Sequence, residues 1–163
     1  MRATFFKHVL KFKIPGGTSR GVLNQKESWF IAVKKENQFG FGECSIIRGL
    51  SPDPLAQIET KLNFVCQNIK LGFDELSKFL QNFPSILFAL ETAYLSLNCK
   101  NPFLFSDSLF VQGKEDIPIN GLIWMGRFTD MKNQIKRKIE NGFDCIKIKI
   151  GSLDFDLECQ LLK

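Results

Sequence analysis

The first part of the chain alternates apolar and polar residues with the period of two that is typical of half-buried β-strands. Residues 2–14 interleave phenylalanine, valine, leucine and isoleucine with lysines, which predicts a first strand. Two further strands are predicted at 28–34 and 39–46, where β-branched and aromatic residues flank a polar turn. The Pro-Gly-Gly-Thr-Ser-Arg-Gly stretch at 15–21 is expected to form a long loop, because glycine relaxes the backbone and proline removes a donor. The pattern therefore predicts a three-stranded antiparallel meander.

Helical spacing replaces this alternation further along the chain. Ser51-Pro-Asp-Pro is a helix-start signal, and the residues that follow, to about 69, place apolar side chains three and four positions apart. Short helices are predicted at 73–80 and 84–97, and the second is expected to be buried because it is mostly apolar. A meander followed by helices indicates an α+β domain.

The order of elements changes again near the C-terminal end. Residues 117–124 and 144–150 are short apolar strand candidates, separated by an amphipathic helix at 129–141 and followed by the start of another helix at 155–163. A β-α-β-α order requires a parallel sheet with a right-handed crossover. Because two parallel strands cannot bury both of their faces, we expect the sequence to be a fragment or truncation of something longer.

Composition narrows the class of protein. The 163 residues are 44% hydrophobic and 24% charged, and 17 of them are phenylalanine, which favours a packed core over stacking on bases. The net charge of +5 is dispersed, and no apolar stretch reaches the roughly 20 residues of a membrane span, so neither a nucleic-acid nor a membrane partner is expected. The N-terminus lacks the unbroken apolar core of a signal peptide, which predicts a cytoplasmic location. The five cysteines form no Cys-x-x-Cys pair and are expected to be reduced, mostly buried thiols.

The second of the late strand candidates carries two lysines that are two positions apart. Successive side chains on a strand point to opposite faces, so Lys147 and Lys149 are predicted to share one face. A solvent-washed strand face is the simplest interpretation. In a covered, partly desolvated β-α-β unit, however, each positive charge disfavours the other, and one lysine can then act as a base.

Two glycine-containing segments are further candidates. Residues 16–21 have the glycine interval of a phosphate-binding loop but lack its Lys-Ser/Thr end, which leaves a flexible surface loop or a substrate lid whose Arg20 pairs with a carboxylate. Glu43 and Arg48 are candidate polar contacts, with Glu43 favoured as a structural partner. The acidic residues at 154–158 fit the first turn of a helix, and no cluster with metal-ligand geometry is visible.

The succession of these segments resembles the enolase superfamily, in its muconate lactonizing and mandelate racemase branch. Within that branch, five segments look like those of the o-succinylbenzoate synthase family: Gly17–Leu23, Gly40–Ser45, Gly49–Asp53, Pro118–Met125 and Gly142–Gly151. The resemblance implies an N-terminal capping domain at 1–115 and the first units of a TIM-type (β/α) barrel at 116–163, truncated after the second strand.

The same resemblance implies a site and a reaction. Lys149 would remove the proton α to a substrate carboxylate, with Lys147 beside it. The cap loops that would close over the substrate contain Thr18, Ser19, Arg20, Gly49 and Leu50. Mg²⁺ is the implied cofactor, but the family places its ligands on later barrel strands, so no metal ligand is expected within this chain. The implied partner is a small-molecule carboxylate, 2-succinyl-6-hydroxy-2,4-cyclohexadiene-1-carboxylate of menaquinone biosynthesis, and a homo-oligomer stays open.

The resemblance implies a carbon–oxygen lyase that dehydrates this substrate to o-succinylbenzoate. Two alternatives remain beside it. A dipeptide epimerase or a muconate-type cycloisomerase of the same superfamily would share the lysine pair but hold a different substrate under the cap. A non-catalytic cap-like binding module would instead pair its unfinished sheet edge with a partner chain. The 163-residue chain on its own is expected to be catalytically inactive, although the longer protein that it resembles would be an enzyme.

Overall fold

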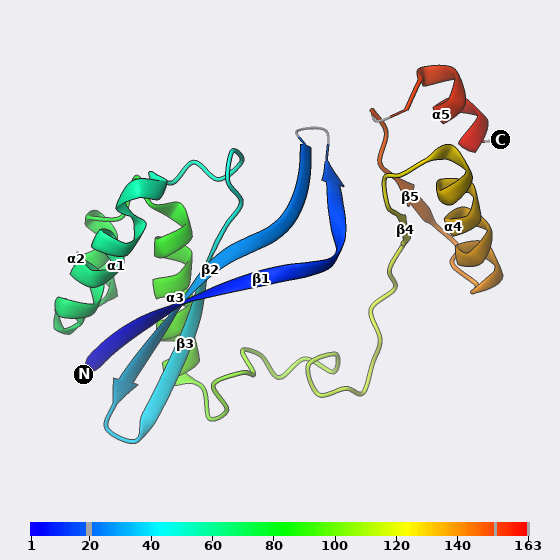
Figure 1. Cartoon of the computed structure of the whole chain (residues 1–163). Helices are drawn as coiled ribbons and strands as arrows, with labels where there is room; N and C mark the ends of the chain where they lie inside the picture. The colour runs from blue at the N-terminus through cyan, green and yellow to red at the C-terminus, as the bar shows by residue number, and fades with distance from the viewer. Residues whose placement is uncertain (19–20, 152, 163) are drawn as a thin grey trace. The chain divides into compact units, whose positions relative to one another are not determined.

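Figure 1 shows the computed structural model of the chain, which describes residues 1–18, 21–151 and 153–162. By packing, the chain divides into two compact units. The first consists of Met1–Lys11 and Gln25–Gln112, and the second of Phe12–Asn24 and Gly113–Lys163. Within the described ranges, no helix combines the length and the apolar content that a membrane crossing requires.

The first element is a three-stranded sheet in the order β1-β2-β3. Its strands are β1 (Arg2–Thr18), β2 (Gly21–Lys35) and β3 (Gln38–Ile46). β2 and β3 are antiparallel, with Glu27 opposite Ile46 at one end of their register. The predicted meander is confirmed.

The prediction of a long loop at 15–21 is wrong. β1 continues through Pro15 and Gly16 to Thr18, and β2 already begins at Gly21. β1 lies at the edge of the sheet, where a proline can occur because its missing N–H need not reach a neighbouring strand. Pro15 and Gly16 therefore lie inside an edge strand.

Helices follow the sheet in the first unit, and one of them packs against it (Figure 1). They are α1 (Ile58–Gln67), α2 (Phe73–Lys78) and α3 (Pro84–Asn98), with single 3₁₀ turns at Leu55–Gln57 and Ile69–Leu71. These bounds confirm the three predicted helices to within a few residues. As expected from its composition, α3 is the most buried helix and contacts β3.

The start of α3 is held by a residue from the helix-start signal. Pro84 occupies the first turn, where its missing N–H costs no helical hydrogen bond. The buried carboxylate of Asp53 accepts hydrogen bonds from the backbone N–H of Ser85 at 3.0 Å and from its hydroxyl at 2.7 Å. The core of the first unit then closes around the sheet and the helices, and its largest fully buried side chains are Ile31, Ile58, Leu62, Leu76, Leu80, Ile86 and Leu90.

The second unit contains a parallel β/α pair. β4 (Gly121–Ile123) lies parallel to β5 (Ile146–Ile148), α4 (Phe128–Glu140) connects them, and α5 (Phe155–Leu161) follows. The predicted β-α-β-α order and parallel sheet are confirmed, although each strand is shorter than predicted. A small core of Ile123, Met131 and Leu161 is completed by Phe128, Ile135, Ile146, Ile148 and Leu153.

The predicted boundary between a cap at 1–115 and a barrel segment at 116–163 stays a prediction. The packing units also divide the first two strands, because residues 12–24 group with the second unit.

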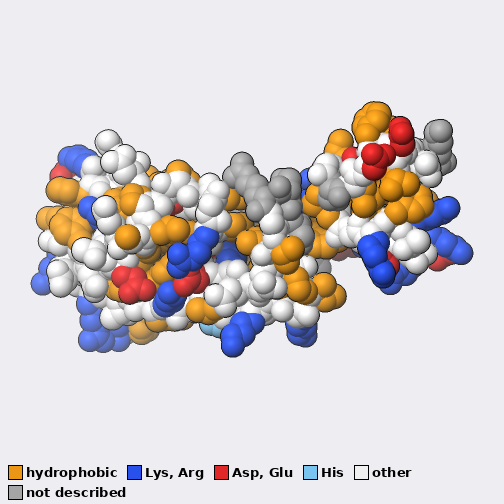
Figure 2. Space-filling model, turned by 45° about the horizontal axis from the view of Figure 1, so that its top comes forward, with side chains coloured by type: hydrophobic (Ala, Val, Ile, Leu, Met, Phe, Trp, Pro, Cys, Tyr) orange, Lys and Arg blue, Asp and Glu red, His pale blue; other side chains and the backbone are white. Residues whose placement is uncertain are grey.

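On the face that Figure 2 shows, Lys and Arg side chains occupy several separate places and form no single patch.

The cysteines are all free, but the expectation that most of them are buried is wrong. Cys44 alone is fully buried, and burial raises the pKa of its thiol to about 12. Cys145 is exposed, and the other three are half-buried. Cys145 directly precedes β5.

Candidate active site

The two lysines lie on β5 and directly after it. Ile146 and Ile148 turn towards the small core beneath the helix, whereas Lys147 is exposed and lies opposite Leu122 in the register. Lys149 follows the end of β5 by one residue and shares the parity of Lys147. In a closed β/α barrel, the face away from the helices is the interior. Lys147 thus lies on the face of β5 opposite the small core, Lys149 directly follows the carboxyl end of β5, where active sites of such barrels are built, and the catalytic roles of both lysines stay predictions.

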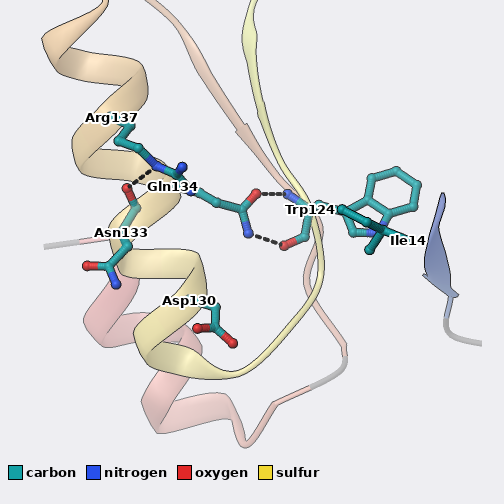
Figure 3. Close-up of a pocket in the computed structure, with 6 residues that line it drawn as sticks. All are labelled: Ile14, Trp124, Asp130, Asn133, Gln134 and Arg137. Atoms are coloured by element: carbon teal, nitrogen blue, oxygen red, sulfur yellow. Dashed lines mark hydrogen bonds between the residues drawn. The ribbon is translucent and has the colours of Figure 1, made fainter.

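An aromatic side chain covers one of the two lysines. The ammonium nitrogen of Lys149 lies 4.5 Å from the ring centroid of Trp124, which follows the end of β4. The backbone of Trp124 is in turn held by Gln134 of α4 (Figure 3). The Trp124 N–H donates to the side-chain oxygen of Gln134 at 2.8 Å, and the Gln134 side-chain amide donates to the Trp124 carbonyl at 3.1 Å. The sequence contained no signal for these two hydrogen bonds, because no short motif links a strand end to a glutamine ten residues later.

A pocket of about 620 Å³ lies beside the same tryptophan. Its lining consists of Ile14, Trp124, Asp130, Asn133, Gln134 and Arg137 (Figure 3). The polar lining comes from α4, and Asp130 is already paired with Arg127 at 2.9 Å. Trp124 therefore lines this pocket and also contacts Lys149.

The segment after β5 is tied down by an acidic residue of α5. Glu158 is only 7% exposed, and its carboxylate accepts hydrogen bonds from the backbone N–H of Gly151 at 2.7 Å and of Leu153 at 3.2 Å. Asp154 caps the helix by accepting from the N–H of Asp156 at 3.0 Å. The predicted acidic first turn is confirmed, and Glu158 also holds the backbone that follows the lysine pair.

Only part of the predicted loop at 16–21 can be placed. Thr18 is the last residue of β1, and its side chain is not among those the structure describes. Ser19 and Arg20 lie outside the described residues. The roles of these three residues in substrate binding stay predictions.

The second predicted cap loop is a tight turn directly after β3. The carbonyl of Ile47 accepts hydrogen bonds from the N–H of Leu50 at 3.0 Å and of Ser51 at 2.9 Å. Gly49 has φ +77°, a left-handed conformation that favours glycine. Leu50 is 57% exposed at the tip. The turn thus presents an apolar side chain to its surroundings, while the substrate contacts of Gly49 and Leu50 stay predictions.

This turn is anchored to the sheet by a carboxylate between two cations. Glu27 of β2 pairs with Lys7 of β1 at 2.6 Å and accepts a hydrogen bond from the Arg48 side chain at 2.8 Å. The hydrogen bond from Lys7 holds the pKa of Glu27 below its ordinary value, and Arg48 acts in the same direction. Sequence reasoning singled out Arg48 but missed Glu27, because the three residues are far apart along the chain.

A second carboxylate, Glu43, lies on β3 with its own partners. It accepts a hydrogen bond from the Ser28 hydroxyl at 2.7 Å and pairs with Lys26 at 3.2 Å. The hydrogen bond from Ser28 lowers the pKa of Glu43, and Lys26 adds to this effect. Both partners lie on β2, so Glu43 joins two strands, as expected of a structural residue.

The Glu27 cluster predicts a loss of stability in acid. A carboxylate whose pKa is lowered by folding stabilises the fold above its ordinary pKa of 4.5, and this stabilisation is lost as the pH falls below that value. We expect Glu27→Gln to lower the free energy of unfolding at neutral pH and to differ less from the parent chain as the pH falls towards about 3. Urea unfolding followed by circular dichroism at several pH values measures both effects.

Glu91→Gln provides the matched control, because Glu91 is an exposed glutamate on α3. Its unfolding curves should follow those of the parent chain at each pH. Identical pH dependence in the Glu27→Gln and parent chains would contradict an ionic anchor at this turn.

The described residues hold no metal site of their own. Within the described ranges, no group of three or more His, Cys, Asp or Glu side chains is arranged to hold a metal ion.

Comparison with known proteins agrees with this architecture. No protein-family model matches the chain. A curated o-succinylbenzoate synthase from Desulfotalea psychrophila is 35% identical, over 99% of this chain and 52% of that protein. A curated hydrophobic dipeptide epimerase from a Flavobacteria bacterium is 26% identical, over 93% of this chain and 45% of that protein. The chain thus spans about half the length of the curated relatives that it matches.

Solved structures extend the likeness to the fold. The crystal structure of MenC from Desulfotalea psychrophila matches with a TM-score of 0.78 and 31% identity, over 99% of this chain and 51% of that one. A dipeptide epimerase from Cytophaga hutchinsonii shares the fold, with a TM-score of 0.73 and 18% identity, over 98% of this chain and 46% of that one. In sequence and in fold, the chain is therefore similar to about half of an o-succinylbenzoate synthase. It also shares the fold of a solved member of the enolase superfamily from Roseovarius nubinhibens, at 16% identity and a TM-score of 0.71, over 99% of this chain and 47% of that one.

Proposed function

We propose that this chain is the N-terminal half of an o-succinylbenzoate synthase, a cytoplasmic carbon–oxygen lyase of menaquinone biosynthesis. The observation that carries the proposal is its 35% identity to the Desulfotalea psychrophila synthase across 99% of the chain. The paired lysines at the end of β5 supply the chemistry that such a reaction needs from this half. The substrate is a small carboxylate, 2-succinyl-6-hydroxy-2,4-cyclohexadiene-1-carboxylate.

Lys149 acts as the base in this proposal. Its neutral amine removes the proton on the carbon α to the carboxylate, and the electron pair of that C–H bond is left in the ring. The pair then forms a ring double bond as the C–O bond breaks and hydroxide departs. The hydroxide takes up the proton that Lys149 holds, so the net products are o-succinylbenzoate and water. Lys147 contributes a positive charge on the same face, which favours a carboxylate there.

Mg²⁺ is present in solved structures of relatives, including the o-succinylbenzoate synthase from Thermosynechococcus elongatus, which matches with 16% identity and a TM-score of 0.58 over 99% of this chain and 47% of that one. The described residues of this chain do not fit a metal site. No step assigned to this chain is therefore routed through the metal.

The proposal is tested by assaying the complete protein with the cyclohexadiene substrate and Mg²⁺. Formation of o-succinylbenzoate, followed by its ultraviolet absorbance, is the expected result. The 163-residue chain alone, assayed in parallel, should give no turnover above background. A complete protein that folds and leaves this substrate untouched would overturn the proposal.

The second candidate function is dipeptide epimerisation. It is favoured by the 26% identity to the curated hydrophobic dipeptide epimerase over 93% of the chain. The same lysines would then exchange the proton on the α-carbon of a dipeptide. Incubation with hydrophobic dipeptides in D₂O distinguishes the two reactions, because only an epimerase should incorporate deuterium at that carbon.

A further inference from the structure

The contact between Trp124 and Lys149 joins the two parallel strands at their carboxyl ends. Trp124 follows β4, Lys149 follows β5, and the amine nitrogen lies 4.5 Å from the centre of the indole. The face of an indole carries partial negative charge, so it attracts an ammonium group placed over it. Lys147 has a different neighbour across the sheet, the aliphatic Leu122. The two lysines therefore have different neighbours, an aromatic ring at Lys149 and an aliphatic side chain at Lys147.

The position of the indole is set by more than its contact with Lys149. Gln134 holds both the N–H and the carbonyl of Trp124, at 2.8 and 3.1 Å, and so fixes the end of β4 against α4 (Figure 3). The ring also lies against Gly16, where a Cβ atom would be 3.4 Å from Cζ2 of the indole. The aromatic surface is therefore in place independently of the lysine.

We infer that Trp124 and Gln134 are positioning residues for Lys149, the indole by covering one side of its amine and the glutamine by holding the indole. A substrate can then approach the amine only from the side that the ring leaves open. Among the described residues, this ring contact is made by Lys149 and not by Lys147. The inference rests on the proposed function in so far as Lys149 is the base.

Competitive acetylation of the 163-residue chain tests this arrangement. The chain is treated with a low concentration of acetic anhydride, and tandem mass spectrometry gives the ratio of modified Lys149 to modified Lys147 in the same molecules. Because the indole covers one amine and attracts its charged form, Lys149 should react about two- to fivefold more slowly than Lys147, the factor that corresponds to an exposed cation–π contact. Equal reaction of the two lysines would overturn the inference.

Variants of Trp124 and Gln134 show whether these residues position Lys149 or only stabilise the fold. Trp124→Leu should bring the ratio close to one, while Trp124→Phe, which keeps a ring, should retain part of the difference. Gln134→Leu should also raise the ratio, and Gln134→Glu should act less, because it keeps the acceptor for the Trp124 N–H. Asn133→Ala is the matched control on the same helix and should leave the ratio unchanged. Circular dichroism confirms that each compared variant is folded.

The outcomes for the inference and for the proposed function are distinguishable. If a folded Trp124→Leu chain keeps the parent ratio, or if leucine and phenylalanine give the same ratio, the inference is wrong whatever the complete protein catalyses. If the ratios change as expected but the complete protein does not convert the cyclohexadiene, the positioning stands and the proposed reaction fails. In an active complete protein, Trp124→Leu should lower kcat more than it alters KM.

Discussion

Lys149→Met should reduce kcat of the complete protein by about a thousandfold, within the range by which a positioned general base accelerates proton transfer. Methionine keeps the length and the apolar stem of the side chain but has no amine to accept the proton. Lys149→Arg should be as inactive, because a guanidinium does not lose its proton in proteins. The measurement is steady-state formation of o-succinylbenzoate by the parent protein and the variants.

Two comparisons sharpen this result. Lys147→Met should have a smaller effect, since Lys147 contributes charge beside the base and does not itself take the proton. Lys132→Met, an exposed lysine on α4, should retain parental activity. If Lys149→Met keeps more than about a tenth of the parental kcat, the base lies elsewhere and the assignment of Lys149 is wrong.

Gly42→Ala should lower the free energy of unfolding by about 3 kcal/mol, because it forces apart two backbones that are in contact. A Cβ atom on Gly42 would lie 1.8 Å from the carbonyl oxygen of Ala89, and one on Gly40 would lie 2.1 Å from that of Ala93. These contacts are with helix backbone, so no side-chain rotation relieves them. Denaturant unfolding of the 163-residue chain, followed by circular dichroism, measures the loss.

The two glycines match the geometry of the helix that they contact. Gly40 and Gly42 are two residues apart on β3, and Ala93 and Ala89 are one helical turn apart on α3. These spacings are both about 6 Å, so the helix can lie directly along the strand. Ser45→Ala, at an exposed position of the same strand, is the control and should change stability little. A loss below about 1 kcal/mol for Gly42→Ala would show that the two elements can separate at low cost.

Sequence periodicity was sufficient for most elements, but the segment at 15–21 shows where it is misleading. Proline and glycines there predicted a loop, yet β1 runs through to Thr18. Turn-forming residues report the local preference of the backbone, whereas a strand at a sheet edge tolerates them because its outer side makes no ladder hydrogen bonds. Whether a strand is an edge strand depends on the order of the whole sheet.

In the candidate site, too, the sequence indicated some of the residues and only the structure revealed the others. Resemblance and spacing singled out Lys147 and Lys149, but Trp124 entered only as one residue of a matching segment, and Gln134 and Glu27 did not enter at all. Glu27 meets Lys7 and Arg48 because pairing of the strands places them together. Gln134 reaches Trp124 because α4 folds back along β4. Such contacts are set by the packing of elements.

The amino-acid sequence by itself determined the antiparallel meander and the β-α-β-α order. These features follow from the alternation of side chains along a strand and from the short reach of a crossover, which are local properties of the backbone. Tertiary structure alone decided the close approach of α3 to the glycines of β3, the anchoring of the 47–51 turn by Glu27, and the indole over Lys149. Each of these depends on two or three segments meeting in space, and the free energy of such a meeting comes from packing and pairing that no single segment contains.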